Sequence, residues 1–182
     1  MCLGRNLIEV YGQKGASHEK VDSIDIDYEP TSILIDKQSS RVFVGNSKGK
    51  VTVYDLDGCS LKEKSSFQNT PYRVTCIDQN NDLFFIGDSM GAIKVWKFDG
   101  ADPKKVSDDM GSHTTVVTKI IVIGDKIHSF AMDNKHSVWN LAQFTRKATR
   151  DNIHRGGILD AAVIGGKIVT CGGDYLVKVH LV

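Results

Sequence analysis

The sequence is poor in the features that mark membrane-spanning, secreted and nucleic-acid-binding proteins. No apolar run approaches the length that spans a bilayer, and the stretch Ile120–Ile123 has the length of a buried strand. The N-terminal residues Met1–Arg5 lack a charged region followed by an apolar core, so we expect no secretory signal. The formal net charge is only +1, which gives no electrostatic reason to expect binding to nucleic acid or to an anionic membrane.

Cysteine is also scarce, and the four cysteines are isolated from one another: Cys2, Cys59, Cys76 and Cys171. None forms a Cys-x-x-Cys pair, which excludes the common zinc and dithiol motifs and leaves reduced cytosolic thiols as the expectation. The glycine pair Gly156–Gly157 is not followed by the Lys-Ser/Thr of a phosphate-binding loop, and no calcium-binding loop occurs. We therefore expect no metal, no cofactor and a cytoplasmic location.

Large rings, in contrast, recur at almost even spacing. They lie 43, 42, 43 and 41 residues apart, and each ends a stretch of alternating apolar residues: Tyr11, Tyr54, Trp96, Trp139 and His180. A period of this size, with a ring at the end of a strand, is typical of a β-propeller array. Hydrophobic residues make up 41% and charged residues 25% of the chain, so we expect it to be globular and not disordered.

Within each period the pattern predicts a small sheet of short strands. An apolar residue lies nineteen positions before each of the last four rings: Ile35, Ile77, Ile120 and Ala161. Short strands separated by turn residues follow one another, and no long helical period occurs. This predicts an all-β fold of about four blades, as a partial or open propeller. The predicted blade bounds are 1–29 (a partial blade), 30–70, 71–113, 114–154 and 155–182, the last without its outer strand.

Two of the repeats carry four polar residues at matching positions. The third full repeat has His113, Ser129, Asp133 and Trp139, and the last repeat has His154, Thr170, Asp174 and His180. Both sets resemble the Asp-His-Ser/Thr-Trp hydrogen-bond tetrad of the WD40 family, in which buried polar groups satisfy one another.

The combination of His, Ser and Asp also invites a catalytic-triad interpretation. The spacing recurs once per repeat, which a single active site would not need, and a hydroxyl buried against an indole is not open to substrate. We therefore predict structural tetrads, no catalytic residue and no enzymatic activity. The first two full repeats lack the set and are expected to rely on apolar packing; their matching residues are Tyr28, Val44, Lys48 and Tyr54, then Thr70, Ile86, Met90 and Trp96.

Several segments resemble the second propeller of the actin-interacting protein 1 family. In chain order they are Asp27–Pro30, Arg41–Gly45, Gly49–Tyr54, Asp57–Glu63, Gly111–Thr114, Ile168–Asp174 and Val177–His180. The resemblance covers nearly the whole chain and implies the C-terminal half of that propeller, without the family's first propeller. It also implies a cytoskeletal protein that works with cofilin to disassemble or cap actin filaments, although it assigns no partner-binding residue. The alternative is a WD40 adaptor fragment in an unrelated protein complex.

About four blades are fewer than a propeller ring usually contains, so a blade face should be left uncovered. Three outcomes follow: the chain is part of a larger ring, two copies form an eight-bladed ring, or another chain closes it. Protein partners would meet the loops, since binding residues usually lie there. The turns expected on one face are Asn46–Lys48, Ser89–Met90, Asp133–Lys135 and Gly173–Tyr175.

Overall fold

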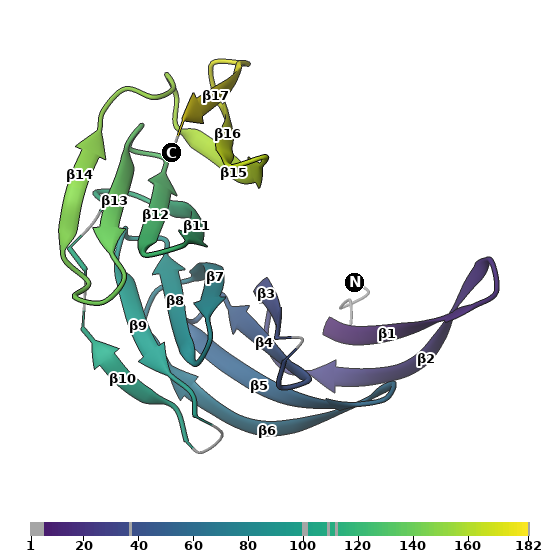
Figure 1. Ribbon diagram of the computed structural model, residues 1–182. Helices are drawn as coiled ribbons and strands as arrows, with labels where there is room; N and C mark the ends of the chain where they lie inside the picture. Colours follow the sequence, from purple (N-terminus) through teal and green to yellow (C-terminus); the bar gives the residue numbers. More distant parts are fainter. Residues whose placement is uncertain (1–5, 37, 100–101, 109, 112, 182) are drawn as a thin grey trace, which may run out of the picture. The chain divides into compact units, whose positions relative to one another are not determined.

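The computed structural model describes residues 6–36, 38–99, 102–108, 110–111 and 113–181 (Figure 1). These residues form seventeen strands in five antiparallel sheets and no helix, which confirms the predicted all-β fold. Accordingly, the described ranges hold no helix with the length and hydropathy needed to cross a membrane. The chain divides into two compact units, residues 1–73 and residues 74–182.

The first unit contains a two-stranded and a four-stranded sheet. Its strands are β1 (Asn6–Lys14) and β2 (Ser17–Ile26), which pair as a hairpin, and β3 (Pro30–Asp36), β4 (Arg41–Asn46), β5 (Lys50–Asp57) and β6 (Ser60–Gln68), which pair in chain order.

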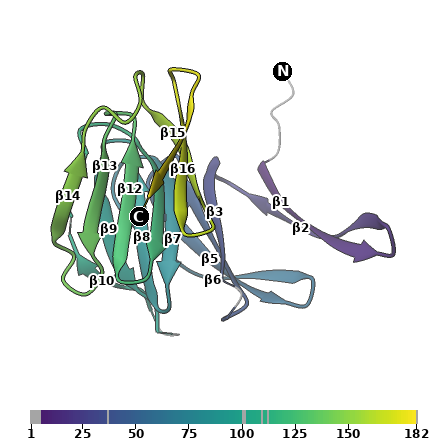
Figure 2. The ribbon, with the colours of Figure 1, turned by 45° about the horizontal axis from the view of Figure 1, so that its top comes forward.

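The second unit contains three sheets, again with strands paired in chain order (Figure 2). The first consists of β7 (Val74–Asn80), β8 (Leu83–Asp88), β9 (Ile93–Lys97) and β10 (Lys104–Ser107). The second consists of β11 (Val117–Ile123), β12 (Lys126–Ala131), β13 (His136–Asn140) and β14 (Arg146–Arg150). The third has three strands: β15 (Ile158–Ile164), β16 (Lys167–Gly172) and β17 (Val177–Leu181).

The strand register repeats from sheet to sheet. The ladder shifts by one residue immediately before a ring residue at Val10/Tyr11, Val53/Tyr54 and Val138/Trp139. Such a bulge bends the strand and increases its twist, which re-aims the ring that follows it. The recurrence at Tyr11 indicates that β1 corresponds to the third strand of a blade, as β5 and β13 do.

The middle strands are buried on both sides because sheets stack face to face within the second unit. We call the side of a sheet that carries its ring residue the leading face and the opposite side the trailing face. The leading face of the β11–β14 sheet, with Ile120, Ile127 and Trp139, packs in one cluster with Phe85 and Val95 of the β7–β10 sheet. Its trailing face, with Phe130, packs on the leading face of the β15–β17 sheet: Ile158, Ala161 and Ile168.

The same hydrogen bond links successive sheets of the second unit. The Thr75 hydroxyl donates to the carbonyl of Val117, and the Thr118 hydroxyl donates to the carbonyl of Ile158 at 2.8 Å. The donors lie 43 residues apart and the acceptors 41 residues apart, in step with the ring period. Successive sheets therefore stack with equivalent strands side by side, so their equivalent turns lie at the same end.

Candidate functional site

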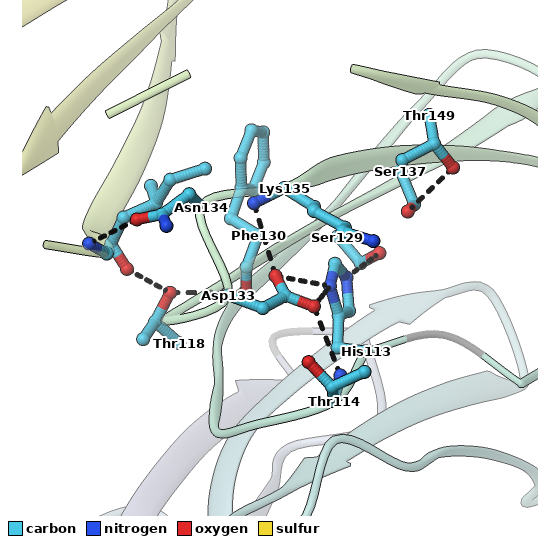
Figure 3. Close-up of polar contacts among 12 residues, drawn as sticks. His113, Thr114, Thr118, Ser129, Phe130, Asp133, Asn134, Lys135, Ser137 and Thr149 are labelled. Carbon is cyan, nitrogen blue, oxygen red and sulfur yellow. Dashed lines mark hydrogen bonds and ion pairs between the residues drawn. The ribbon is translucent and has the colours of Figure 1, made fainter. Parts of the chain in front are cut away.

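His113, Ser129 and Asp133 meet at the β11–β14 sheet (Figure 3), and Trp139 of β13 contacts Ser129. His113 Nδ1 lies 3.1 Å from both carboxylate oxygens of Asp133, and its Nε2 lies 2.8 Å from Ser129 Oγ. The indole N–H of Trp139 donates to the same Ser129 Oγ at 3.0 Å. Asp133 also accepts the backbone N–H groups of Thr114 and Lys135, which ties the network to the β12–β13 turn.

The donors and acceptors of this network fit a single proton arrangement. Burial lowers the pKa of His113, against the opposing effect of Asp133, so the imidazole is neutral at pH 7. Its Nδ1–H then donates to Asp133, and its Nε2 accepts the Ser129 hydroxyl proton, which leaves Ser129 Oγ free to accept from Trp139. Every polar side-chain group of the set has a partner, as buried polar groups require.

The residues His154, Thr170, Asp174 and His180 form an equivalent network in the β15–β17 sheet. His154 lies 2.7 Å from Asp174 through Nδ1 and 2.8 Å from Thr170 Oγ1 through Nε2, while His180 Nε2 lies 3.0 Å from the same Oγ1. Burial would raise the pKa of Asp174, but hydrogen bonds from His154 and from the backbone N–H groups of Arg155 and Leu176 hold it well below its usual range. His180 thus takes the place of the tryptophan as the ring that contacts the central hydroxyl.

The β3–β6 sheet contains a polar contact that the sequence did not predict. Tyr54 and Val44 are buried in an apolar cluster, in line with the expectation of apolar packing. However, the Tyr28 and Tyr54 hydroxyls lie 2.6 Å apart. Tyr28 occupies the repeat position of His113, so a direct ring-to-ring hydrogen bond replaces the relay through a serine.

Sequence reasoning also missed the residues that organise the first two of the equivalent turns. Asn46 Oδ1 accepts the backbone N–H groups of Lys48 and Lys50, and Asp88 Oδ1 accepts those of Met90 and Ala92. Both acceptors lie two positions earlier in the repeat than Asp133. An Asn or Asp at the end of the preceding strand was visible in the sequence, and a search that included the position before the turn would have found it.

A second buried histidine pair lies outside the tetrads. His128 and His136 are each only 2% exposed, their rings stack at 5.2 Å, and His128 Nδ1 lies 2.9 Å from His136 Nε2. Burial, reinforced by Lys126 and Arg150 nearby, lowers the pKa of His128 to about 4. Burial, together with His128 and Arg150, lowers the pKa of His136 to about 3. Both imidazoles are therefore neutral at pH 7, on the trailing face of the β11–β14 sheet.

The geometry gives the Ser129 hydroxyl no access to a substrate. Ser129 is fully buried, and its oxygen contacts both an imidazole and an indole nitrogen. In the part of the chain that the structure describes, no three His, Cys, Asp or Glu side chains gather in a way that could hold a metal ion. Of the four cysteines, Cys2 lies outside the described residues, and Cys59, Cys76 and Cys171 are free thiols.

The equivalent turns of the second unit expose apolar side chains. Met90 follows β8, Met132 follows β12, and Tyr175 lies between β16 and β17. Tyr175 is 99% exposed and has a positive φ of 62°. These three side chains lie at one end of the unit, because the sheets stack with equivalent strands alongside one another.

Solved structures similar to this chain include a WD40 β-propeller domain, a chain of a checkpoint complex and designed proteins. The WD40 β-propeller domain of Doa1 superposes with a TM-score of 0.76 and 16% identity, covering 94% of this chain and 57% of that one. A chain of the Mitotic Checkpoint Complex gives 0.75 and 20%, covering 93% and 52%. The computationally designed Ika4 protein gives 0.70 and 19%, covering 86% of this chain and 93% of that one. Together with the repeated sheets, these similarities define the fold as an array of WD40-type β-propeller blades.

Sequence comparison gives two particular relatives of the same class. Over 47 residues, or 25% of this chain, the sequence is 47% identical to WD repeat-containing proteins 1-B and 1-A of Xenopus laevis. The matched stretch is 8% of the length of those proteins. No family model matches the chain.

Proposed function

We propose that this chain is a non-enzymatic, cytoplasmic interaction scaffold that takes part in the cofilin-dependent disassembly of actin filaments. Two findings support the proposal. Segments spread along the chain resemble the actin-interacting protein 1 family, and a 47-residue stretch is 47% identical to WD repeat-containing proteins 1. The blade architecture suits this role because a rigid sheet array holds its turns in fixed positions for contact with a partner.

The exposed turns of the second unit are the proposed contact surface, and Tyr175 is the observation that carries this choice. Tyrosine and methionine are enriched in protein interfaces, where tyrosine supplies a large contact area with few rotatable bonds. Tyr175 is 99% exposed, so its ring is almost uncovered by the described residues. Met90 and Met132 extend the apolar surface along the equivalent turns.

Cosedimentation with actin filaments tests the proposal directly. The full chain should pellet with cofilin-decorated filaments more than with bare filaments, and a Tyr175→Ser variant should pellet less. Loss of a well-packed interface tyrosine weakens binding by about tenfold or more. Val106→Ser is the matched control, because Val106 is also exposed but lies on the outer strand β10.

The two variants separate the possible results. If Tyr175→Ser and Val106→Ser reduce pelleting equally, the turns of the second unit are not the contact surface. No pelleting of the unaltered chain, with or without cofilin, would contradict the actin role. In that case the chain would be a WD40 adaptor for other proteins, the alternative that the fold also allows.

A further inference from the structure

The trailing face of the β15–β17 sheet is apolar and uncovered. In the preceding sheet, the trailing face buries Phe130 completely against β15 and β16. On the β15–β17 sheet the corresponding face instead exposes Ile164 by 69%, Val179 by 62% and Leu181 by 76%. A shallow hollow of about 140 Å³ lies on this face, lined by Ala162, Val169, Cys171 and neighbouring residues.

The same sheet also lacks a strand. The β3–β6, β7–β10 and β11–β14 sheets each have four strands, whereas β17 pairs only with β16 in the described residues. Its outer edge therefore presents unpaired backbone groups beside the exposed apolar face. An exposed strand edge beside an apolar face is a template for pairing with another strand.

The first unit has the complementary deficiency on the leading face of the β3–β6 sheet. The β1–β2 hairpin covers the outer part of this face, where Ile8 and Val10 pack on Tyr54 and its neighbours. The inner part is open: Ile35 is 55% exposed, although its repeat equivalent Ile120 is only 2% exposed. Beside Ile33, a groove of about 400 Å³ runs between β1 and β3, lined by Leu7, Ile8, Pro30 and Ser32.

The two deficiencies match strand by strand. The β15–β17 sheet supplies the first three strands of a blade and lacks the fourth. The β1–β2 hairpin corresponds to the third and fourth strands of a blade and lacks the first two. Counted back from their rings, Val177 and Val179 of β17 occupy the repeat positions of Ile8 and Val10 of β1.

We infer that the trailing face of the β15–β17 sheet binds the leading face of the β3–β6 sheet of a second copy of this chain. In this head-to-tail contact β15 and β16 cover the open part of the leading face, where Ile33 and Ile35 are exposed. Strand β17 takes the place of β1 beside β2 of the other copy, and β2 becomes its fourth strand. Each copy carries both faces, so two such contacts join two copies into a closed dimer.

The interface is a repetition of one that the chain already contains. Within the second unit, a trailing face meets a leading face at each junction of successive sheets, with apolar packing and the same threonine hydrogen bond. The lengths of the Doa1 domain and the Mitotic Checkpoint Complex chain, though not that of Ika4, fit a second copy as the occupant. The chain covers 57% of the Doa1 propeller domain and 52% of the Mitotic Checkpoint Complex chain, so two copies supply about one full propeller.

Light scattering on the full chain, over a range of concentrations, tests the inference. The expected mass is twice the chain mass of 20.0 kDa. Val179→Asp on the trailing face and Ile35→Asp on the leading face should each raise the dissociation constant by at least about a hundredfold, because an unpaired carboxylate would be buried twice per dimer. Val106→Asp, at an exposed valine of β10, should leave the mass unchanged.

Mixing the two defective variants gives the decisive result. A mixture of Val179→Asp and Ile35→Asp retains one intact head-to-tail contact and should regain the dimer mass, although each variant alone is monomeric. Val177→Asp provides a second trailing-face variant if Val179→Asp loses its far-UV spectrum. A monomer at every concentration, a dimer that neither charge disrupts, or a mixture that remains monomeric would overturn the inference. None of these results depends on whether the chain binds actin.

Discussion

Replacing Ser129 with alanine removes the atom on which the first tetrad converges. In the native structure, Ser129 Oγ accepts from the Trp139 indole and contacts His113 Nε2, and the side chains of all three residues are buried. The alanine variant removes the partner of the indole N–H and of the imidazole Nε2 in a buried site.

The expected cost follows from the number of orphaned groups. Each buried polar group left unsatisfied costs about 1–3 kcal/mol, so the loss of two partners should lower the free energy of unfolding by about 2–6 kcal/mol. That is a large share of the roughly 5–15 kcal/mol that stabilises a typical domain. The apolar volume removed is negligible, so the cost is almost entirely polar.

Urea unfolding, followed by far-UV circular dichroism, measures this cost. The midpoint should fall while the dependence on denaturant stays constant, because the surface exposed on unfolding is unchanged. Ser137→Ala is the matched control: Ser137 is equally buried on the adjacent strand, but its hydroxyl contacts only Thr149 Oγ1, at 3.3 Å. If the Ser129→Ala variant loses no more stability than the Ser137→Ala variant, the tetrad does not stabilise the sheet as argued.

Two further predictions concern pH and backbone conformation. The pKa of His128 is lowered to about 4 and that of His136 to about 3, so both histidines bind protons in the unfolded chain before they do so in the folded chain. The two neutral histidines therefore cost no stability above about pH 6.5. As the pH falls below that value, the free energy of unfolding should decrease by up to about 2.7 kcal/mol per pH unit for the pair. Urea midpoints that stay level from about pH 7 to about pH 5 would contradict this. Gly49 and Gly58 both have positive φ, but a Cβ at Gly49 would lie 1.9 Å from the Thr70 carbonyl oxygen, whereas at Gly58 it would meet nothing within 4 Å. Gly49→Ala should therefore lower the thermal midpoint clearly more than Gly58→Ala, and equal shifts would show that the close approach has no energetic weight.

The sequence pattern predicted the parts of the fold that depend on local periodicity. The ring spacing located the third strand of each blade, and the Asp-His-Ser/Thr pattern brought together the residues that meet at Ser129 and Thr170. These features can be predicted from the sequence because the same residue spacing recurs in successive repeats. The division of the chain at residue 73 leaves no comparable mark in the sequence.

The contacts that sequence reasoning missed depend on packing between sheets or on a change of residue type. His128 and His136 show no ligand spacing, and they come together by stacking on each other and on Phe130. The hydrogen bond between the Tyr28 and Tyr54 hydroxyls joins the same two repeat positions as a tetrad does, but with different side chains. A search for histidine and serine therefore does not find it. The polar pattern therefore predicts the hydrogen bonds where the residues of a WD40-type tetrad occur, and it does not predict them where other residues replace these.

The central claim is that Tyr54, Trp96 and Trp139 occupy equivalent buried positions in successive WD40-type blades, whereas Tyr11 is 56% exposed, and the Trp139 indole tests this claim most directly. The chain has two tryptophans, so its ¹H–¹⁵N spectrum contains two indole signals, from Trp96 and Trp139. We predict that the Trp139 indole proton exchanges with solvent far more slowly than a free indole, and that Ser129→Ala shifts and accelerates this signal while the Trp96 signal keeps its position. A Trp139 indole that exchanges at the free rate in the unaltered chain would contradict the account.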